Sequence, residues 1–311
     1  MKKLLAVVTV VCIVLGLLGG CRESSENAGT KATEETALPP QETENTELKE
    51  ETPTTMATEA PEKITIEETV IYDENGIKIT ARSVFETESA FHLTLKLENH
   101  SDKKASFYLS HCILNGFSVM GRYGNLEAEP GTEDITSVAF ENADMEFLGR
   151  KYWGTYDIAT IVGANAELTV EDTVIPVPFS LVTSAGVDYE PSFDDSGEIL
   201  YEKDGITVIY KEVIETTEGD ALTLLVINET GKDFVLESVE EFVNGTEMGL
   251  PLWDYVFRDA ISCCYIILSP DSLEHHGINK VETVRFALIM SNTETFRMFA
   301  KSDAIEISLP Q

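Results

Sequence analysis

Basic residues are scarce in this sequence of 311 residues. Lysine and arginine together number 22 against 55 aspartate and glutamate residues, so the formal net charge is −33 at pH 7. Such a field repels phosphate backbones and anionic lipid headgroups, which excludes nucleic acid as a partner. The acidity is compatible with cations or basic partners, but solubility is its plainest consequence.

Cysteine is too rare to build a disulfide framework. Of the five cysteines, Cys12 lies in an apolar N-terminal run and Cys21 directly follows that run. Cys112, Cys263 and Cys264 remain in the rest of the chain. An odd number of cysteines in an exported protein leaves at least one thiol free or paired between chains, and the sequence does not decide which.

Signatures of catalysis are missing as well. There is no Gly-x-Ser-x-Gly elbow, no phosphate-binding loop and no His-Glu-x-x-His pair. Acidic pairs are frequent, but with 55 carboxylates some closeness is expected by chance and says nothing about a glycosidase pair. We therefore predict that the protein is not an enzyme, with a hydrolase that uses an unrecognised acidic site as a remote alternative.

Metal-binding patterns are equally thin, and we predict no cofactor. Three adjacent pairs offer zinc ligands without the spacing of a zinc site: His111-Cys112, Cys263-Cys264 and His275-His276. The one metal hypothesis is calcium at Asp194, Asp195 and Glu198, where a cation could stiffen a hinge. The full alternation of an EF-hand loop is absent there, so a polar turn is the alternative.

The N-terminal segment has the strongest motif in the chain. Met1-Lys2-Lys3 forms a basic head, and an unbroken apolar run of 15 residues extends from Leu4 to Leu18. A membrane-spanning helix needs about 20 such residues, so the run is typical of a signal peptide instead.

The residues at the end of this run point to lipidation. Leu18, Gly19, Gly20 and Cys21 resemble the lipobox of bacterial lipoproteins. The resemblance implies a signal peptide of residues 1–20 and a covalent diacylglycerol on Cys21. Because two acyl chains suffice for stable anchoring, we expect the protein on the extracytoplasmic face of the cell membrane. An ordinary signal peptide followed by an incidental cysteine is the alternative.

Residues 21–63 form an acidic segment rich in threonine, glutamate and proline. Large apolar residues are almost absent, so the segment cannot bury enough surface to offset chain entropy. The composition predicts a disordered tether that is kept extended by charge repulsion and proline.

The remainder of the chain contains the same unit twice. A shift of 129 residues places ILNGFSV at 113–119 on FVNGTEM at 242–248. The same shift superimposes Leu93-Thr94-Leu95 on Leu222-Thr223-Leu224. This recurrence predicts an internal duplication of a whole domain. We name residues 64–182 repeat 1 and residues 198–311 repeat 2, joined by a linker at 183–197.

Alternation of apolar and polar residues indicates that each unit is all-β. Phe91, Leu93, Leu95 and Leu97 share one face of a predicted strand, while ALTLLVIN at 221–228 is apolar on both faces. Four Asn-Gly or Asp-Gly dipeptides predict hairpin turns: Asn75-Gly76, Asn115-Gly116, Asp204-Gly205 and Asn244-Gly245. Asn99 and Asn228, each followed two residues later by Ser or Thr, are interpreted as turn caps. The pattern favours two tandem β-sandwiches.

Proline marks one strand as an edge. Pro176 and Pro178 remove two N–H groups from the same side of VIPVPFSLV at 174–182, so that side cannot pair. Repeat 2 has Ala304 and Glu306 at the matching places, which leaves its edge open to a partner.

The repeated phrases also resemble a known family. Tyr-x-x-x-Gly-Ile, then Leu-x-Leu-x-x-x-Asn-x-Ser/Thr, then Asn-Gly, is similar to the immunoglobulin-like domains of unknown function in Gram-positive lipoproteins. The resemblance covers both repeats and implies two tandem immunoglobulin-like domains. Its motifs are turns and strand ends, so it implies no catalytic or binding residues.

Two aromatic clusters are the candidate ligand sites. One holds Tyr152, Trp153 and Tyr156, and the other holds Trp253 and Tyr255. Exposed rings would form a platform for sugar rings or a hydrophobic partner, whereas buried rings would be part of the core. We predict a lipid-anchored module that binds an envelope protein or glycan without catalysis. An accessory scaffold or inhibitor of an envelope enzyme or transporter is the alternative.

Overall fold

The computed structural model describes residues 63–309 except for residues 148, 156, 187 and 191. They all belong to one compact unit, Glu59–Gln311. The predicted signal peptide, Cys21 and residues 21–62 of the tether lie outside the described residues. None of the helices in the described part is long and apolar enough to cross a membrane.

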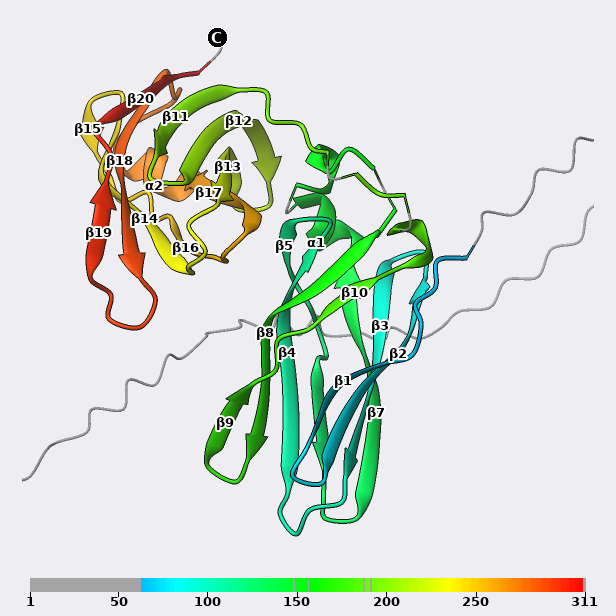
Figure 1. The fold of residues 1–311 in the computed structure, drawn as a ribbon. Helices are drawn as coiled ribbons and strands as arrows, with labels where there is room; N and C mark the ends of the chain where they lie inside the picture. Colours follow the sequence, from blue (N-terminus) through cyan, green and yellow to red (C-terminus); the bar gives the residue numbers. More distant parts are fainter. Residues whose placement is uncertain (1–62, 148, 156, 187, 191, 310–311) are drawn as a thin grey trace, which may run out of the picture. The chain divides into compact units, whose positions relative to one another are not determined.

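Repeat 1 consists of ten strands and one short helix, which Figure 1 shows in blue to green. The strands are β1 (Thr69–Glu74), β2 (Ile77–Glu86), β3 (Ala90–Asn99), β4 (Ala105–Leu114), β5 (Phe117–Met120), β6 (Asn125–Ala128), β7 (Thr132–Glu141), β8 (Thr160–Val170), β9 (Thr173–Pro176) and β10 (Ser180–Val182). The helix α1 (Asn142–Phe147) and the 3₁₀ turn η1 (Arg150–Tyr152) lie between β7 and β8. A second 3₁₀ turn, η2 (Ser184–Gly186), opens the linker.

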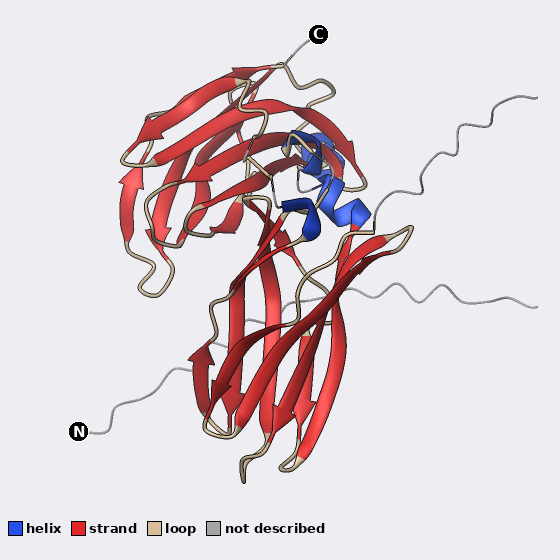
Figure 2. Ribbon diagram, turned by 45° about the vertical axis from the view of Figure 1, so that its right-hand side comes forward, coloured by secondary structure: helices blue, strands red, loops and turns tan. Residues whose placement is uncertain are grey.

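Repeat 2 follows the same order of elements. Its strands are β11 (Glu198–Lys203), β12 (Ile206–Thr216), β13 (Gly219–Asn228), β14 (Phe234–Val243), β15 (Thr246–Glu247), β16 (Trp253–Val256), β17 (Ala260–Leu268), β18 (Thr283–Asn292), β19 (Met298–Lys301) and β20 (Ile305–Ser308). The helix α2 (Pro270–His275) again precedes the eighth strand. Strands dominate throughout, as Figure 2 shows, so the all-β prediction is confirmed.

The two repeats share one strand order in each of their layers. The order β1-β2-β3-β7 in repeat 1 corresponds to β11-β12-β13-β17 in repeat 2. In the second layer, β4 pairs with β5, β6 and β8 just as β14 pairs with β15, β16 and β18. Each pair of layers encloses apolar side chains, as expected of β-sandwiches.

One sheet runs continuously from repeat 1 into repeat 2. Strand β5 lies parallel to β17, with Phe117 opposite Ile261, and the amide of Ile261 donates to the carbonyl of Gly116 at 2.8 Å. This contact joins the two half-sheets into one sheet of ten strands.

The repeated Asn-Gly phrases are turns with a second function. Asn115 and Gly116 have φ of 52° and 90°, and both residues of the other three predicted turns also have positive φ, which confirms the turn predictions. The carboxamide oxygen of Asn115 accepts from the amides of Ala159 and Thr160, and Asn244 binds Glu282 and Thr283 in the same way. Each turn therefore fixes the start of the strand beside it.

Asn99 and Asn228 cap the ends of matching strands, as interpreted from the sequence. The Asn99 oxygen accepts from the amide and hydroxyl of Ser101, at 3.0 and 2.7 Å, and its amide donates to two backbone carbonyls. Asn228 repeats this network around Thr230. Both asparagines are fully buried, so each must satisfy its own polar atoms inside the sandwich.

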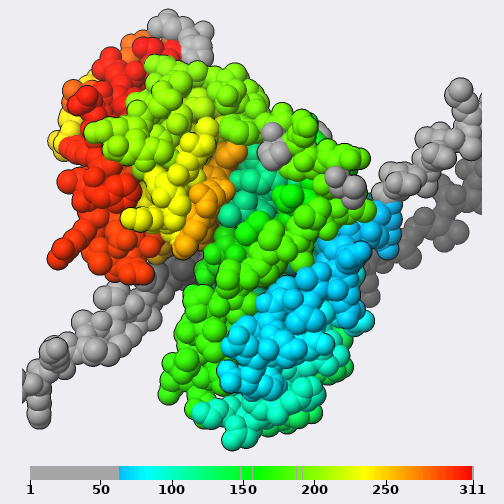
Figure 3. Space-filling model, in the orientation of Figure 1, coloured from blue at the N-terminus to red at the C-terminus, as the bar shows by residue number. Residues whose placement is uncertain are grey.

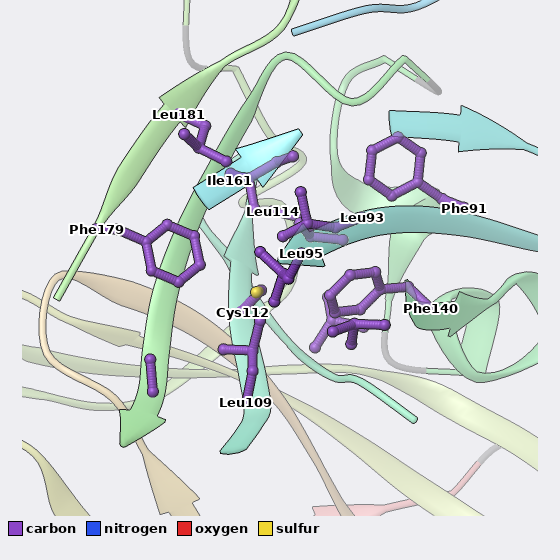
Figure 4. Packing of buried hydrophobic residues seen from close by; sticks show 14 of the residues in the cluster. Phe91, Leu93, Leu95, Leu109, Cys112, Leu114, Phe140, Ile161, Phe179 and Leu181 are labelled. Carbon is purple, nitrogen blue, oxygen red and sulfur yellow. The ribbon is translucent and has the colours of Figure 1, made fainter. Parts of the chain in front are cut away.

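The core of repeat 1 confirms the predicted alternation of β3. Phe91, Leu93, Leu95 and Leu97 are all at most 1% exposed, while the intervening residues are half-buried. Figure 4 shows Leu93 and Leu95 packed among side chains from the opposite layer, including Leu114 and the thiol-bearing Cys112.

The proline-containing segment lies at a sheet edge, as predicted, but it forms two short strands, with Pro178 in the break between them, and not one continuous strand. Strands β9 and β10 each pair with β8 alone, and Pro176 faces Glu167 at the end of β9. In repeat 2, β19 and β20 likewise pair only with β18 among the described strands.

Candidate functional site

The first predicted aromatic cluster is part of the core, which corrects the platform hypothesis for its described members. Trp153 is 0% exposed and stacks at 5.5 Å on Phe117, and Tyr152 is 5% exposed. The turn η1 carries both rings inward against apolar neighbours, where burial stabilises them more than exposure would. Tyr156 lies outside the described residues.

Tyr152 instead belongs to the joint between the repeats. Its hydroxyl donates to Glu212 Oε1 at 2.7 Å, and Lys151 pairs with the same oxygen. The ammonium of Lys211 lies 4.7 Å from the centre of the Tyr152 ring, and its side chain is only 5% exposed. The joint therefore combines apolar packing with a buried cation–π contact.

This joint explains why β13 is apolar on both faces. Leu225, Ile261 and Cys263 point away from the core of repeat 2 and pack into the hydrophobic cluster of repeat 1. Tyr265 on the same side stacks on Phe147 of repeat 1 at 4.1 Å. The signal in the sequence was that ALTLLVIN is apolar on both faces of the strand. That pattern predicted deeper burial, but it did not identify repeat 1 as the surface that covers the second face.

The three carboxylates predicted to bind calcium do not come together. Asp194 pairs with Lys211 at 3.2 Å and accepts the amide of Ser196 at 2.9 Å. Across the described ranges, no group of three or more carboxylate, histidine or cysteine side chains could hold a metal ion, Asp195 and Glu198 included. At Asp194, therefore, the neighbouring cation is the Lys211 ammonium.

The three cysteines of the folded region are buried free thiols. Cys112 is 0% exposed, and Cys263 and Cys264 are adjacent on opposite faces of β17. Burial raises the pKa of Cys112 and Cys264 far above the ordinary thiol value, and raises that of Cys263 to about 11. Because the thiolate is the reactive form, these thiols are inert at neutral pH.

The second aromatic cluster is exposed, in contrast to the first. Trp253 is 53% exposed and Tyr255 is 40% exposed, and their rings meet edge to face at 5.0 Å. Both lie on β16, two residues apart, so they share the outer face of the sheet.

Three further apolar side chains of repeat 2 are exposed on β19 and the turn that precedes it. The register aligns Tyr255, Val235, Ser291 and Met298 across β16, β14, β18 and β19, and the two middle residues of this row are buried. Met298, Phe296 and Phe299 are between 56% and 59% exposed. We call Trp253, Tyr255, Phe296, Met298 and Phe299 the apolar patch. Figure 3 shows the yellow and red segments of repeat 2 on one side of the molecule, and in the sheet β14 and β18 lie between β16 and β19.

Repeat 1 is polar at the positions that match the core of this patch. Asn125 occupies the place of Trp253, and Glu127 occupies the place of Tyr255, because each pair faces corresponding residues of β4 and β14. Glu127 forms an ion pair with Lys104 at 2.6 Å. The aromatic pair is therefore particular to repeat 2 and is no requirement of the fold.

A carboxyl lies beneath the patch. Asp254 faces Leu236 and the core of repeat 2, whereas the matching residue of repeat 1 is the fully buried Leu126. Burial raises the pKa of Asp254, while the Cys264 thiol and the Tyr255 amide act in the opposite direction.

A second hollow surface adjoins the joint. A groove of about 770 Å³ lies between β8, the β9–β10 edge and the loop that connects β16 to β17. We call it the junction groove. Its lining is Ile113, Asn115, Gly116, Thr160, Val162, Gly163, Ala164, Ala166, Pro176, Pro178, Ser180, Tyr189, Asp233, Phe257, Arg258 and Asp259. Nothing in the sequence predicted it, because its two walls come from different repeats.

Comparison with known proteins adds no function. No family model matches this sequence, and no curated protein matches it. Two solved structures are similar at 13% identity. The crystal structure of the conserved domain protein from Bacillus anthracis covers 79% of this chain and 92% of its own, with a TM-score of 0.23. Bacteroides uniformis beta-glucuronidase 2, covalently bound to cyclophellitol-6-carboxylate aziridine, covers 78% of this chain with a TM-score of 0.22. This chain spans 27% of that enzyme's length, and at such TM-scores neither likeness carries an argument.

The contrast between the two tryptophans predicts effects of different size on stability. Trp153→Ala should lower the free energy of unfolding by about 3–5 kcal/mol, because it leaves a cavity in the core. Trp253→Ala should change it by less than about 1 kcal/mol, because more than half of that side chain is already in water. Urea denaturation followed by circular dichroism compares the two, and equal losses would contradict the assignment.

The buried carboxyl predicts a pH-dependent effect. The pKa of Asp254 is higher in the folded state than in the unfolded chain. The protein is therefore most stable below the pKa of the unfolded state, and it loses stability as the pH rises through the pKa of the folded state. Asp254→Asn should therefore be more stable than the wild type at pH 7, and the difference should shrink at acid pH. Urea denaturation over a pH series measures this, with the exposed Asp271→Asn as control. A gain that is the same at every pH would refute the explanation.

Proposed function

We propose that the protein is a lipid-anchored, non-enzymatic recognition protein of the extracytoplasmic envelope, and that the apolar patch of repeat 2 binds an envelope protein. The observation that carries the proposal is the clustering of exposed apolar residues. Five of the six large apolar residues that are exposed in the described part of repeat 2 belong to the patch.

The composition of the patch favours a protein partner over a glycan. Aromatic residues and methionine are enriched at protein interfaces, and tryptophan and tyrosine are enriched among the residues that dominate binding energy. Trp253 and Tyr255 stand edge to face at 82°, so they do not offer one flat surface to a sugar ring. Met298, Phe296 and Phe299 add apolar area that hydroxyl groups would not complement.

The fold holds the apolar patch on a rigid sheet. The patch lies on a sheet and its adjoining hairpin, and the sheet is held by the Asn228 and Asn244 networks. A lipid on Cys21 and an extended tether would place such a surface at the membrane without fixing its orientation. An accessory scaffold or inhibitor of an envelope enzyme would use the same surface, so it is a special case of this proposal.

The anchor has its own test. The N-terminal peptide of the mature chain, isolated from membranes, should begin at Cys21 and carry the mass of a diacylglyceryl thioether. Cys21→Ala should release the chain from the membrane fraction, whereas Cys12→Ala should not. A bare Cys21 in a secreted chain would contradict the anchor without bearing on the patch.

The patch is tested by giving repeat 2 the residues of repeat 1. In cells that express the full chain with benzoylphenylalanine at Met298, light should produce one predominant adduct with an envelope protein. The double variant Trp253→Asn, Tyr255→Glu should reduce the adduct at least about 30-fold, because two interface aromatics that contribute about 1 kcal/mol or more each stabilise the complex by about 2 kcal/mol together.

Two controls make the result specific. Tyr108→Ala removes an aromatic residue that is 50% exposed in repeat 1, and should leave the adduct unchanged. An adduct that survives the double variant would show that the patch is not the binding surface. Glycan-array binding that is lost in the double variant would replace the protein partner with a glycan.

A further inference from the structure

The junction groove is built from both repeats, and its floor is unusually bare. Along β8 the lining residues are Thr160, Val162, Gly163, Ala164 and Ala166, so the strand presents backbone and small side chains. A side chain at Gly163 would meet the Phe179 ring at 2.4 Å, which keeps this position small. Small side chains on a floor leave room for side chains of a ligand.

Aromatic rings form the walls of the groove. Phe257 of repeat 2 packs against the His111 ring at 5.1 Å, so a repeat 1 side chain holds this wall in place. Burial lowers the pKa of His111, so that ring is neutral at neutral pH. Tyr189 of the linker lies on the other side, with its hydroxyl 3.5 Å from the carbonyl of Asn115. The walls are therefore apolar and fixed from both repeats.

Charge is confined to the rim and has a negative excess. Arg258 is held by Asp233 through two contacts, Nε to Oδ1 at 3.0 Å and a terminal nitrogen to Oδ2 at 2.7 Å. That pair is close to neutral, which leaves the carboxylate of Asp259 as the net charge of the lining. The rim therefore complements a ligand with a positive group.

The groove continues into a second hollow. That hollow, of about 450 Å³, shares Asn115, Gly116 and Asp259 with the groove and continues past Glu229 and Phe193. The two hollows meet at Asp259, so apolar lining lies on both sides of its carboxylate. Pockets at domain interfaces commonly bind ligands, and two hollows in series fit an extended ligand.

We propose that the junction groove binds an extended peptide segment whose apolar side chains lie on the floor of β8 and whose lysine or arginine pairs with Asp259. The backbone of β8 is already paired with β4, β9 and β10, so the peptide adds no strand to the sheet. Affinity comes from apolar burial, and selectivity comes from the charge at Asp259. The site is separate from the apolar patch and does not depend on it.

The test starts from the full chain in detergent, presented with a displayed library of random hexapeptides. Enriched sequences should combine apolar residues with a lysine or arginine. A labelled copy of the best sequence, measured by fluorescence anisotropy, should bind Ala164→Trp at least tenfold more weakly, because the indole would occupy the floor. Asp259→Asn should weaken binding about tenfold and reduce its salt dependence.

Asp259→Asn is a mild change because asparagine tolerates the positive φ of 52° at this position. A double-mutant cycle between Asp259 and the peptide tests the proposal even if Ala164→Trp folds poorly. Replacing the basic residue of the peptide by norleucine should weaken binding to the wild type but not to Asp259→Asn. Asp73→Asn in repeat 1 and the double variant of the apolar patch are matched controls that should bind the peptide normally.

Three outcomes would overturn the proposal. One is a selection on the wild type that enriches no peptide relative to the same selection on Ala164→Trp. Another is enrichment of acidic or purely polar sequences, which the rim carboxylate would repel. The third is a cycle with no coupling between Asp259 and the basic residue of the peptide. If the double variant of the apolar patch no longer binds its envelope protein but still binds the peptide, the two sites are independent.

Discussion

The burial of the outer face of β12, β13 and β17 against repeat 1 is the contact on which the rest of the structure depends. Leu225, Ile261 and Cys263 would be in water in an isolated sandwich, and they are at most 8% exposed here. Trp153 and Phe117 fill the same cluster from the other side. Burial of a large apolar side chain contributes about 1.5–3 kcal/mol, so a surface of this kind outweighs a backbone hydrogen bond such as that from Ile261 to Gly116, which contributes about 1 kcal/mol.

The matching face of repeat 1 has a different character. It carries His92, Thr94, Lys96 and Glu98, all half-buried and polar. Lys96 forms an ion pair with Glu133 at 2.7 Å, which would be costly to desolvate. The same strand position is therefore an apolar docking face in repeat 2 and a polar surface in repeat 1.

The two candidate recognition surfaces arise where the repeats differ. The patch exists because β16 has Trp253 and Tyr255 where β6 has Asn125 and Glu127. The groove exists because the loop with Phe257 and Arg258, which comes from repeat 2, lies opposite β8 of repeat 1. The common fold provides the support, and the divergent residues provide the chemistry.

Local rules in the sequence were enough for the strands, the turns, the asparagine caps and the proline edge. Each depends on neighbours within a few residues: alternation along β3, positive φ at Asn115-Gly116, or a missing N–H at Pro176. Local sequence could not tell the buried aromatic cluster from the exposed one. Both stretches, Tyr152-Trp153 and Trp253-Asp254-Tyr255, combine tryptophan with tyrosine. Burial depends on what packs against a side chain, and the cluster that contains Trp153 also includes Ile261 and Cys263, more than 100 positions away. The sequence by itself determined an acidic, all-β architecture. Only the tertiary structure decided which rings meet solvent, because that depends on how one repeat docks on the other.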